Sequence, residues 1–218
     1  MKGDDGMARK PDAVRTLILI LCNYFPLAHA VGCGCCIAFA PGWAWKLGSF
    51  LACLYLLPVL LSRLVLLVHP LRRNRVPVYS PDHCVWWFTF CTQMLYLRFP
   101  FLEEALRTVP ALYSLWLRLW GSKIGKLVYW TAGTKVLDRS FLRIGDHVGF
   151  GIGTILGTHL HVGDEFIIAP ITLEDNVVLG AHSLVGPGVT VKAWEATKTM
   201  FLAPPFSVWK DGRRIVKG

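Results

Sequence analysis

Two histidines lie two residues apart in the C-terminal third of the chain, His159 and His161. Imidazole titrates near neutral pH, so either ring could take the proton from an attacking hydroxyl or amine. A carboxylate would orient such a ring, and the acids available are Asp138, Asp164 and Glu165. These residue types indicate acid–base chemistry, with His159 and His161 as the candidates for the base.

The segment that holds these histidines follows a period of six residues. An apolar residue, usually followed by glycine or an acidic residue, recurs at Ile144, Phe150, Leu156 and Val162 and then at Leu173, Leu179, Val185 and Val191. This pattern is typical of a hexapeptide parallel β-helix, in which three units form one turn of the coil. Counting from Ile124 to Val191, with roughly 18 residues a turn, predicts about four turns.

The period shifts by one residue near Pro170, directly after the two histidines. An irregularity at this point would push a loop out of the coil beside them. Asp138 precedes His159 by a little more than the roughly 18 residues of one turn, so we expect it one layer away. In an extended segment residues two apart point the same way, so both histidines face one cleft unless a turn separates them.

The N-terminal part of the chain has the composition of a membrane segment. Of the 218 residues, 54% are hydrophobic and 17% are charged, whereas roughly a quarter are charged in a typical soluble domain. Residues 17–40 and 49–68 are each close to the ~20 residues that cross a bilayer, and Trp43 and Trp45 between them suit the headgroup zone. The pattern predicts a transmembrane helical hairpin within residues 1–75; a signal peptide cleaved after Ala30 is the alternative.

Basic residues predict the orientation of this hairpin. Arg63 lies inside the second span near one end, where its side chain can reach the interface. The loop between the spans holds only Lys46, whereas the two flanks hold Lys2, Arg9, Lys10 and Arg15 and then Arg72, Arg73 and Arg75. The positive-inside rule therefore predicts an integral membrane protein whose β-helix lies on the cytoplasmic side.

A third segment, residues 76–121, joins the hairpin to residues 122–218, which hold the β-helix and a C-terminal tail. Residues 84–96 are aromatic-rich, and residues 109–120 form a basic amphipathic pattern with Pro110 in the first turn and Gly121 as the cap. We expect amphipathic helices lying in the membrane interface. Packing of the same helices against the end of the β-helix is the alternative.

None of the seven cysteines falls in the repeat. Cys33 and Cys36 form a C-x-x-C pair, but no second pair completes a disulfide or metal set. Beside Gly32 and Gly34 they are interpreted as small residues that allow close helix packing. The sequence therefore predicts no metal site.

Residues 113–190 resemble the hexapeptide-repeat acyltransferases. The resemblance rests on the segment from Leu117 to Gly125, on Thr158-His159-Leu160 and on residues 171–190. It is strongest to a membrane-associated branch that also forms the C-terminal domains of ε-poly-lysine-synthetase-like proteins. The resemblance implies a left-handed β-helix, a homotrimer, acyl-CoA as co-substrate in the cleft between neighbouring coils, and His159 as general base.

Positive charge and small residues are expected to bind the donor. Gly180, Ala181 and Gly186 would leave room for a pantetheine arm, and Lys192 and Lys198 could meet the phosphates. Acyl carrier protein is an alternative donor, and the acceptor would be a hydroxyl or amine at the membrane, such as a lipid or lipid-linked sugar. No permanently bound cofactor is expected, and the basic residues follow no nucleic-acid-binding motif.

Two other functions remain open at this point. A relative of the γ-type carbonic anhydrases would use histidines as zinc ligands, and His147, His159, His161 and His182 are available, although no pair lies five residues apart. The other possibility is a non-catalytic scaffold or partner subunit.

Overall fold

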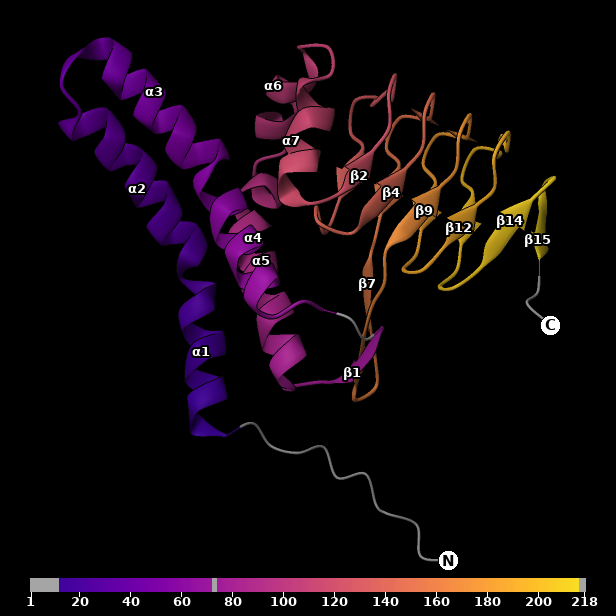
Figure 1. Ribbon diagram of the computed structural model, residues 1–218, viewed down its shortest axis with the longest axis horizontal. Coiled ribbons are helices and arrows are strands. Elements are labelled where there is room, and N and C mark those ends of the chain that lie inside the picture. The colour runs from indigo at the N-terminus through magenta and orange to yellow at the C-terminus, as the bar shows by residue number, and fades with distance from the viewer. Residues whose placement is uncertain (1–11, 72–73, 216–218) are drawn as a thin grey trace, which may run out of the picture.

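The computed structural model describes residues 12–71 and 74–215. Helices occupy the N-terminal part and short strands the C-terminal part, so the chain is of mixed helix and sheet (Figure 1). Lys2, Arg9, Lys10, Arg72 and Arg73, which contribute to the predicted orientation, lie outside the described residues.

Four helices form the N-terminal hairpin: α1 (Ala13–Asn23), α2 (Phe25–Phe39), α3 (Gly42–Tyr55) and α4 (Leu57–Val68). Pro26 and Pro58 lie just after the breaks between the helices of each arm, because proline lacks the N–H that an interior helical position donates. Helices α3 and α4 together make one helical segment, Gly42–Val68, of 27 residues with mean hydropathy 2.4. This segment is long and apolar enough to cross a membrane. The α1–α2 pair, bent by 41°, would be a second span if taken as one unit.

Three further helices pack between the hairpin and the strands: α5 (Pro81–Arg98), α6 (Phe101–Arg107) and α7 (Leu112–Trp120). Helix α5 contacts α1, α2 and α4, and it buries side chains along most of its length. On α7, Leu117 and Trp120 are fully buried in the same core as Ile124 and Ile144. Both segments thus pack against other parts of the chain, and α7 closes one end of the coil. Their place in the membrane interface stays a prediction.

Gly121 ends α7 as predicted, with φ 109° and its N–H donating to the Arg118 carbonyl. Pro110 precedes the helix instead of lying in its first turn, since α7 begins at Leu112. The guanidinium of Arg63 lies beside Gly121. A positive charge is favourable at the C-terminal end of a helix, so Arg63 has a partner within the protein.

Twelve strands build the coil and its tail. They are β2 (Lys123–Ile124), β3 (Lys135–Val136), β4 (Leu142–Ile144), β5 (Gly149–Phe150), β6 (Ile155–Leu156), β9 (Ile171–Leu173), β10 (Val178–Leu179), β11 (Leu184–Val185), β12 (Thr190–Val191), β13 (Leu202–Ala203), β14 (Val208–Lys210) and β15 (Arg213–Ile215). Three parallel stacks result, β2-β4-β9-β12-β14, β5-β10 and β3-β6-β11-β13, and β15 adds to β14 antiparallel. The chain visits the stacks in turn, so the predicted repeat forms successive turns of one coil (Figure 1).

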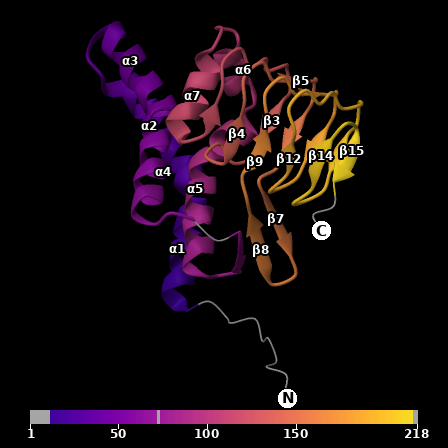
Figure 2. The same ribbon diagram turned by 45° about the vertical axis from the view of Figure 1, so that its right-hand side comes forward.

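The register shows where the repeat is interrupted. Lys135 pairs with Ile155, Ile155 with Leu184 and Leu184 with Leu202, steps of 20, 29 and 18 residues. The 29-residue step contains an antiparallel hairpin of β7 (His159–Val162) and β8 (Glu165–Ile168), which β1 (Arg75–Pro77) extends by pairing with β8. Figure 2 shows this hairpin projecting from the coil alongside α5.

Two predictions about the repeat are therefore wrong. The units at residues 157–168 leave the coil, and Val162 is 52% exposed instead of pointing inward. Gly163, with φ 56°, turns the chain back. The coil also continues beyond Val191, through Ala203 to β14, so the tail forms part of it.

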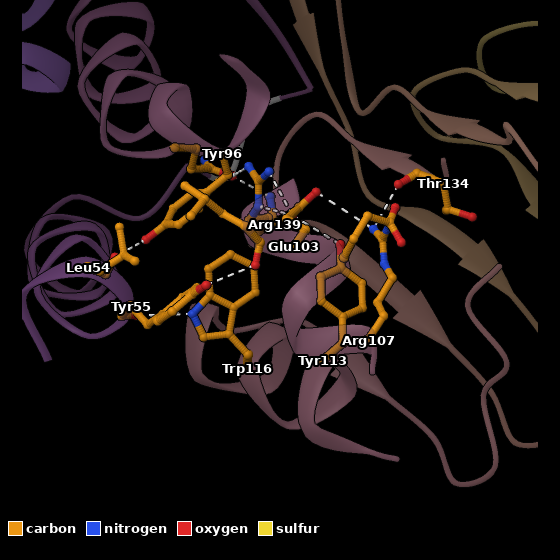
Figure 3. A network of polar contacts seen from close by, with 12 residues as sticks. Leu54, Tyr55, Tyr96, Glu103, Arg107, Tyr113, Trp116, Thr134 and Arg139 are labelled. Atoms are coloured by element: carbon orange, nitrogen blue, oxygen red, sulfur yellow. Dashed lines mark hydrogen bonds and ion pairs between the residues drawn. The ribbon is translucent and has the colours of Figure 1, made fainter. Parts of the chain in front are cut away.

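A buried polar network joins the coil to the helices (Figure 3). Arg139, fully buried, donates from Nε to Glu103 Oε1 at 2.8 Å and from Nη1 to Gln93 Oε1 at 3.1 Å. Tyr113 also donates its hydroxyl to Glu103 Oε1 at 3.1 Å. These contacts bring the β3–β4 connection, α5, α6 and α7 together, so the coil is attached to the helices at a defined position.

Candidate active site

Asp138 and His159 meet where the β7–β8 hairpin leaves the coil. His159 Nδ1 lies 2.5 Å from Asp138 Oδ2, which also accepts from the Thr158 hydroxyl at 2.6 Å. The other carboxylate oxygen, Oδ1, accepts from the indole N–H of Trp86 at 2.9 Å. The carboxylate is fully buried, yet it has three donors.

These donors keep Asp138 charged. Burial alone would raise its pKa, but the charge of His159 and the hydrogen bonds from His159, Thr158 and Trp86 outweigh burial, and the pKa lies below its usual value. An ionised carboxylate only accepts hydrogen bonds, so Nδ1 of His159 carries the proton. In the neutral ring with this tautomer, Nε2 holds the lone pair that can take a proton from a substrate.

Aromatic rings fix the His159 imidazole. Its centroid lies 4.8 Å from that of Trp86, 5.2 Å from Phe90 and 6.0 Å from Phe166. Trp86 and Phe90 come from α5, whereas Phe166 comes from β8, so helix and hairpin hold the ring together. The side chain keeps 17% of its surface exposed, which combines a fixed orientation with access.

His161 lies on the same side of β7 as His159, as their spacing of two residues predicts. Its ring is 4.8 Å from Phe166 and 5.8 Å from the buried His83. Burial and then the proximity of His159 lower the pKa of His161. Burial and then His161 lower the pKa of His83 to about 4, so both rings are neutral near pH 7.

A cavity of about 380 Å³ adjoins these histidines. Its volume lies within the range of small-molecule sites. The walls come from α1, from the β1–α5 segment and from β7: Thr16, Leu19, Ile20, Asn23, Val78, Tyr79, His83, Trp87 and His161. A ligand in this cavity would contact His161 and the apolar N-terminal hairpin at the same time.

The residues expected to bind the donor are not gathered in one place. A Cβ on Gly180 would meet the backbone of Lys198, and one on Gly186 would meet Ala203 and Pro205. Within this chain the next turn of the coil therefore packs against both glycines, and their role beside a pantetheine arm stays a prediction. Ala181 adjoins Gly180 and approaches Gly151 of the previous turn in the same way.

The two lysines of the predicted donor site differ in their surroundings. Lys192 Nζ forms an ion pair with Glu174 Oε1 at 2.6 Å. Lys198 is exposed and lies in the segment between β12 and β13. Of these two lysines, only Lys198 presents an exposed side chain that forms no ion pair with another described residue.

The histidines considered as zinc ligands are dispersed. His147 lines a second cavity, of about 740 Å³, beside α7 and the first turn of the coil. His182 packs over Gly153 at another corner of the coil. Within residues 12–71 and 74–215, no group of metal-ligating side chains includes His147, His159, His161 or His182.

Sequence reasoning missed three members of the site: His83, Trp86 and Phe166. For Trp86 the available signal was the aromatic-rich character of residues 84–96, but this pattern could not show which face of the helix meets the coil. Thr158 belongs to the Thr-His-Leu motif, and its hydroxyl donates to the Asp138 carboxylate that orients His159.

No protein-family model matches the chain, and no curated protein matches it. Among solved structures, the chain is similar to a hexapeptide-repeat-containing acetyltransferase of Vibrio cholerae O1 biovar eltor complexed with acetyl coenzyme A. The identity is 20% and the TM-score 0.37, over 54% of this chain and 82% of that one.

Two other solved structures are more distant. A maltose O-acetyltransferase from Clostridium difficile 630 is 16% identical with a TM-score of 0.23, over 56% of this chain and 88% of that one. Serine acetyltransferase isoform 3 from Entamoeba histolytica, in complex with cysteine, is 13% identical with a TM-score of 0.27, over 97% and 87%. Overlaps of this quality do not establish a shared fold, and the left hand of the coil stays a prediction.

Proposed function

We propose that this protein is an acyltransferase that moves an acetyl or longer acyl group from a thioester to a hydroxyl or amine of a membrane-associated acceptor. The donor is acyl-CoA or acyl carrier protein, with no permanently bound cofactor. The α1–α4 hairpin holds the protein in the bilayer, and the coil lies on the cytoplasmic side, where such thioesters are made. Single coils assemble as a homotrimer, in which a neighbouring coil completes the donor site.

The buried Asp138–His159 pair is the observation that carries this proposal. His159 Nε2 takes the proton from the acceptor hydroxyl or amine as its oxygen or nitrogen attacks the thioester carbonyl. The tetrahedral intermediate then expels the thiolate, and His159 returns the proton to that sulfur. Asp138 holds the ring in one orientation and stabilises the imidazolium formed between the two steps.

The position of the cavity supports an acceptor at the membrane. Leu19 and Ile20 of α1 face it from one side, and His161 faces it from the hairpin that carries His159. An acyl chain or the apolar part of a lipid would bury its surface against α1, which is favourable by ~25 cal/mol per Å² of apolar surface. The reacting hydroxyl or amine would then lie near the histidines.

The test uses the full chain purified in detergent with acetyl-CoA and longer acyl-CoAs, in the presence of extracted membrane lipids. Thiol release measures donor turnover, and mass spectrometry of the lipids identifies the acylated product. We expect His159→Ala to lower kcat by about 10²- to 10⁴-fold, the usual contribution of a general base. His182→Ala is the matched control and keeps wild-type activity.

Full activity in His159→Ala would exclude this residue as the base. A wild-type protein that neither binds CoA nor releases thiol would favour the non-catalytic scaffold.

A further inference from the structure

Three side chains with metal-binding atoms meet inside the N-terminal hairpin, away from the candidate active site. His29 and Cys33 lie on α2, and Cys53 lies on α3. Their ligand atoms all lie within 4.8 Å of one another. His29 is 3% exposed and Cys33 5% exposed, whereas Cys53 is half-buried.

The orientation of His29 is the most informative part of the cluster. Its Nε2 lies 2.9 Å from the backbone carbonyl oxygen of Cys53. A carbonyl only accepts, so Nε2 carries the proton and Nδ1 presents a lone pair. Nδ1 is buried and has no hydrogen-bond partner within residues 12–71 and 74–215.

A buried polar atom without a partner is costly, and native proteins avoid it. Metal-binding histidines usually donate their other ring N–H to a carbonyl or carboxylate, which fixes the tautomer and aims the free nitrogen at the ion. The His29–Cys53 contact has this arrangement. The missing partner of Nδ1 is therefore best supplied by a metal ion.

The helix spacing supports the same interpretation. His29 and Cys33 are four residues apart, so they share one face of α2. Gly32 allows α3 to come close, because a Cβ there would lie 3.5 Å from the Cys53 sulfur. The small residues that the sequence assigned to close helix packing thus also bring the third ligand within reach.

We propose that His29, Cys33 and Cys53 bind one Zn²⁺ ion that links α2 to α3. Mixed imidazole and thiolate ligands are those that zinc favours, with bonds of about 2.0–2.3 Å in tetrahedral sites. Small side-chain rotations would bring the three ligand atoms to the separations of a tetrahedral site, leaving the fourth position for another ligand.

Charge favours zinc over monovalent copper. Binding releases one proton from each thiol, and two thiolates with a neutral imidazole cancel the charge of Zn²⁺. The same ligands around Cu⁺ would leave a net negative charge in apolar surroundings, which is unfavourable. A neutral site is the one that suits the interior of an apolar hairpin.

The site would also stabilise the helices that lie behind the active site. Leu54, next to Cys53, accepts a hydrogen bond from the hydroxyl of Tyr96 on α5. Ring centroids of His29 and Tyr96 are 6.5 Å apart. An ion at the cluster would therefore hold α2, α3 and α5 in register.

The experiment measures metal content in the full chain, purified in detergent without chelators from cells grown with added zinc. Elemental analysis by mass spectrometry should find about one zinc ion per wild-type chain. Cys33→Ser, Cys53→Ser and His29→Gln should each lose most of it. Cys35→Ser is the matched control, because Cys35 lies on the same helix but is exposed, and it should keep the ion.

A second measurement avoids dependence on the folding of the variants. Wild-type protein stripped of metal and reloaded with Co²⁺ should show thiolate-to-cobalt charge-transfer absorption, which Zn²⁺ then removes by displacement.

Four results would overturn the proposal. They are wild-type protein that neither carries nor takes up zinc, loss of zinc in the Cys35→Ser control, copper in place of zinc, or a Cys33–Cys53 disulfide trapped by alkylation in intact cells. Acyl-transfer assays are independent of all four, so the failure of one proposal leaves the other standing.

Discussion

Asp138 and Arg139 are adjacent, oppositely charged and both fully buried, yet they serve two different regions. Asp138 turns toward the β7–β8 hairpin and bonds His159, whereas Arg139 turns toward the helices and bonds Glu103 and Gln93. Both charges are satisfied, so burial and pairing do not distinguish them.

The difference lies in the partners. Arg139 cannot lose its proton in a protein, and neither Arg139 nor Glu103 is among the residues that line the two cavities. Asp138 is paired with an imidazole whose side chain is partly exposed, and His161 on the same strand lines a cavity. A titratable partner with access, rather than a buried charge alone, distinguishes a candidate catalytic group from a structural one.

The largest expected effect separates the two regions by stability. Arg139→Met leaves Glu103 buried without its main partner, and breaking a buried pair costs about 3–5 kcal/mol of unfolding free energy. Thermal unfolding in detergent should show a melting temperature lower by ~2–4 °C for each kcal/mol. Arg143→Met, at an exposed position on β4, is the control. An unchanged melting temperature in Arg139→Met would contradict the structural role.

The next effect concerns activity. Asp138→Asn keeps the size of the side chain but removes the charge that orients His159, so kcat should fall by about 10²-fold while KM for the donor changes little. The Asp164→Asn variant, in the exposed turn of the same hairpin, should match wild type. If Asp138→Asn instead raised KM with kcat unchanged, Asp138 would be a binding residue and not a positioning one.

The smallest effect is a dependence of stability on pH. The pKa of His83 is about 4 in the folded chain and near 6.5 unfolded, so the unfolded state binds more protons between these values. Stability is therefore complete above pH 6.5 and falls as the pH drops toward 4. Each pH unit below 6.5 removes up to about 1.4 kcal/mol, so we expect the melting temperature to fall by roughly 3–6 °C for each unit.

His83→Gln should flatten this slope. His161, the titratable neighbour of His83, has a pKa lowered in the same direction and leaves a residual slope in the variant. Asp138 acts only below its ordinary pKa of 3.8, outside this window. An equal slope in wild type and variant would show that His83 does not titrate in this range.

Much of the coil could be predicted because its signal is local. Ile144, Phe150, Leu173 and Val185 follow the period of six and are all buried. The shift of the period near Pro170 predicted a loop at this point, but the extent of the β7–β8 hairpin escaped prediction because residues 157–168 imitate the same period. Phe166 finds its partner in Trp86, 80 positions earlier in the chain, at a ring-centroid distance of 4.0 Å, and no local pattern encodes that contact.

The candidate site divides in the same way. His159 could be chosen from its place in the Thr158-His159-Leu160 motif, and Asp138 from residue type and spacing, since one turn of the coil sets their separation. The aromatic rings around His159 and the unpartnered nitrogen of His29 could not, because each depends on how α5 or α3 packs against a distant segment.

The sequence by itself determined the apolar hairpin, the repeat of the coil, the cap at Gly121 and the candidate base. Each of these follows from forces between residues that are near in the chain or one period apart. Tertiary structure alone decided that the β7–β8 hairpin meets α5. It also decided that Arg139 bonds Glu103 and Gln93 and that His29 faces Cys53. Those contacts depend on which surfaces bury one another, which is a property of the whole chain.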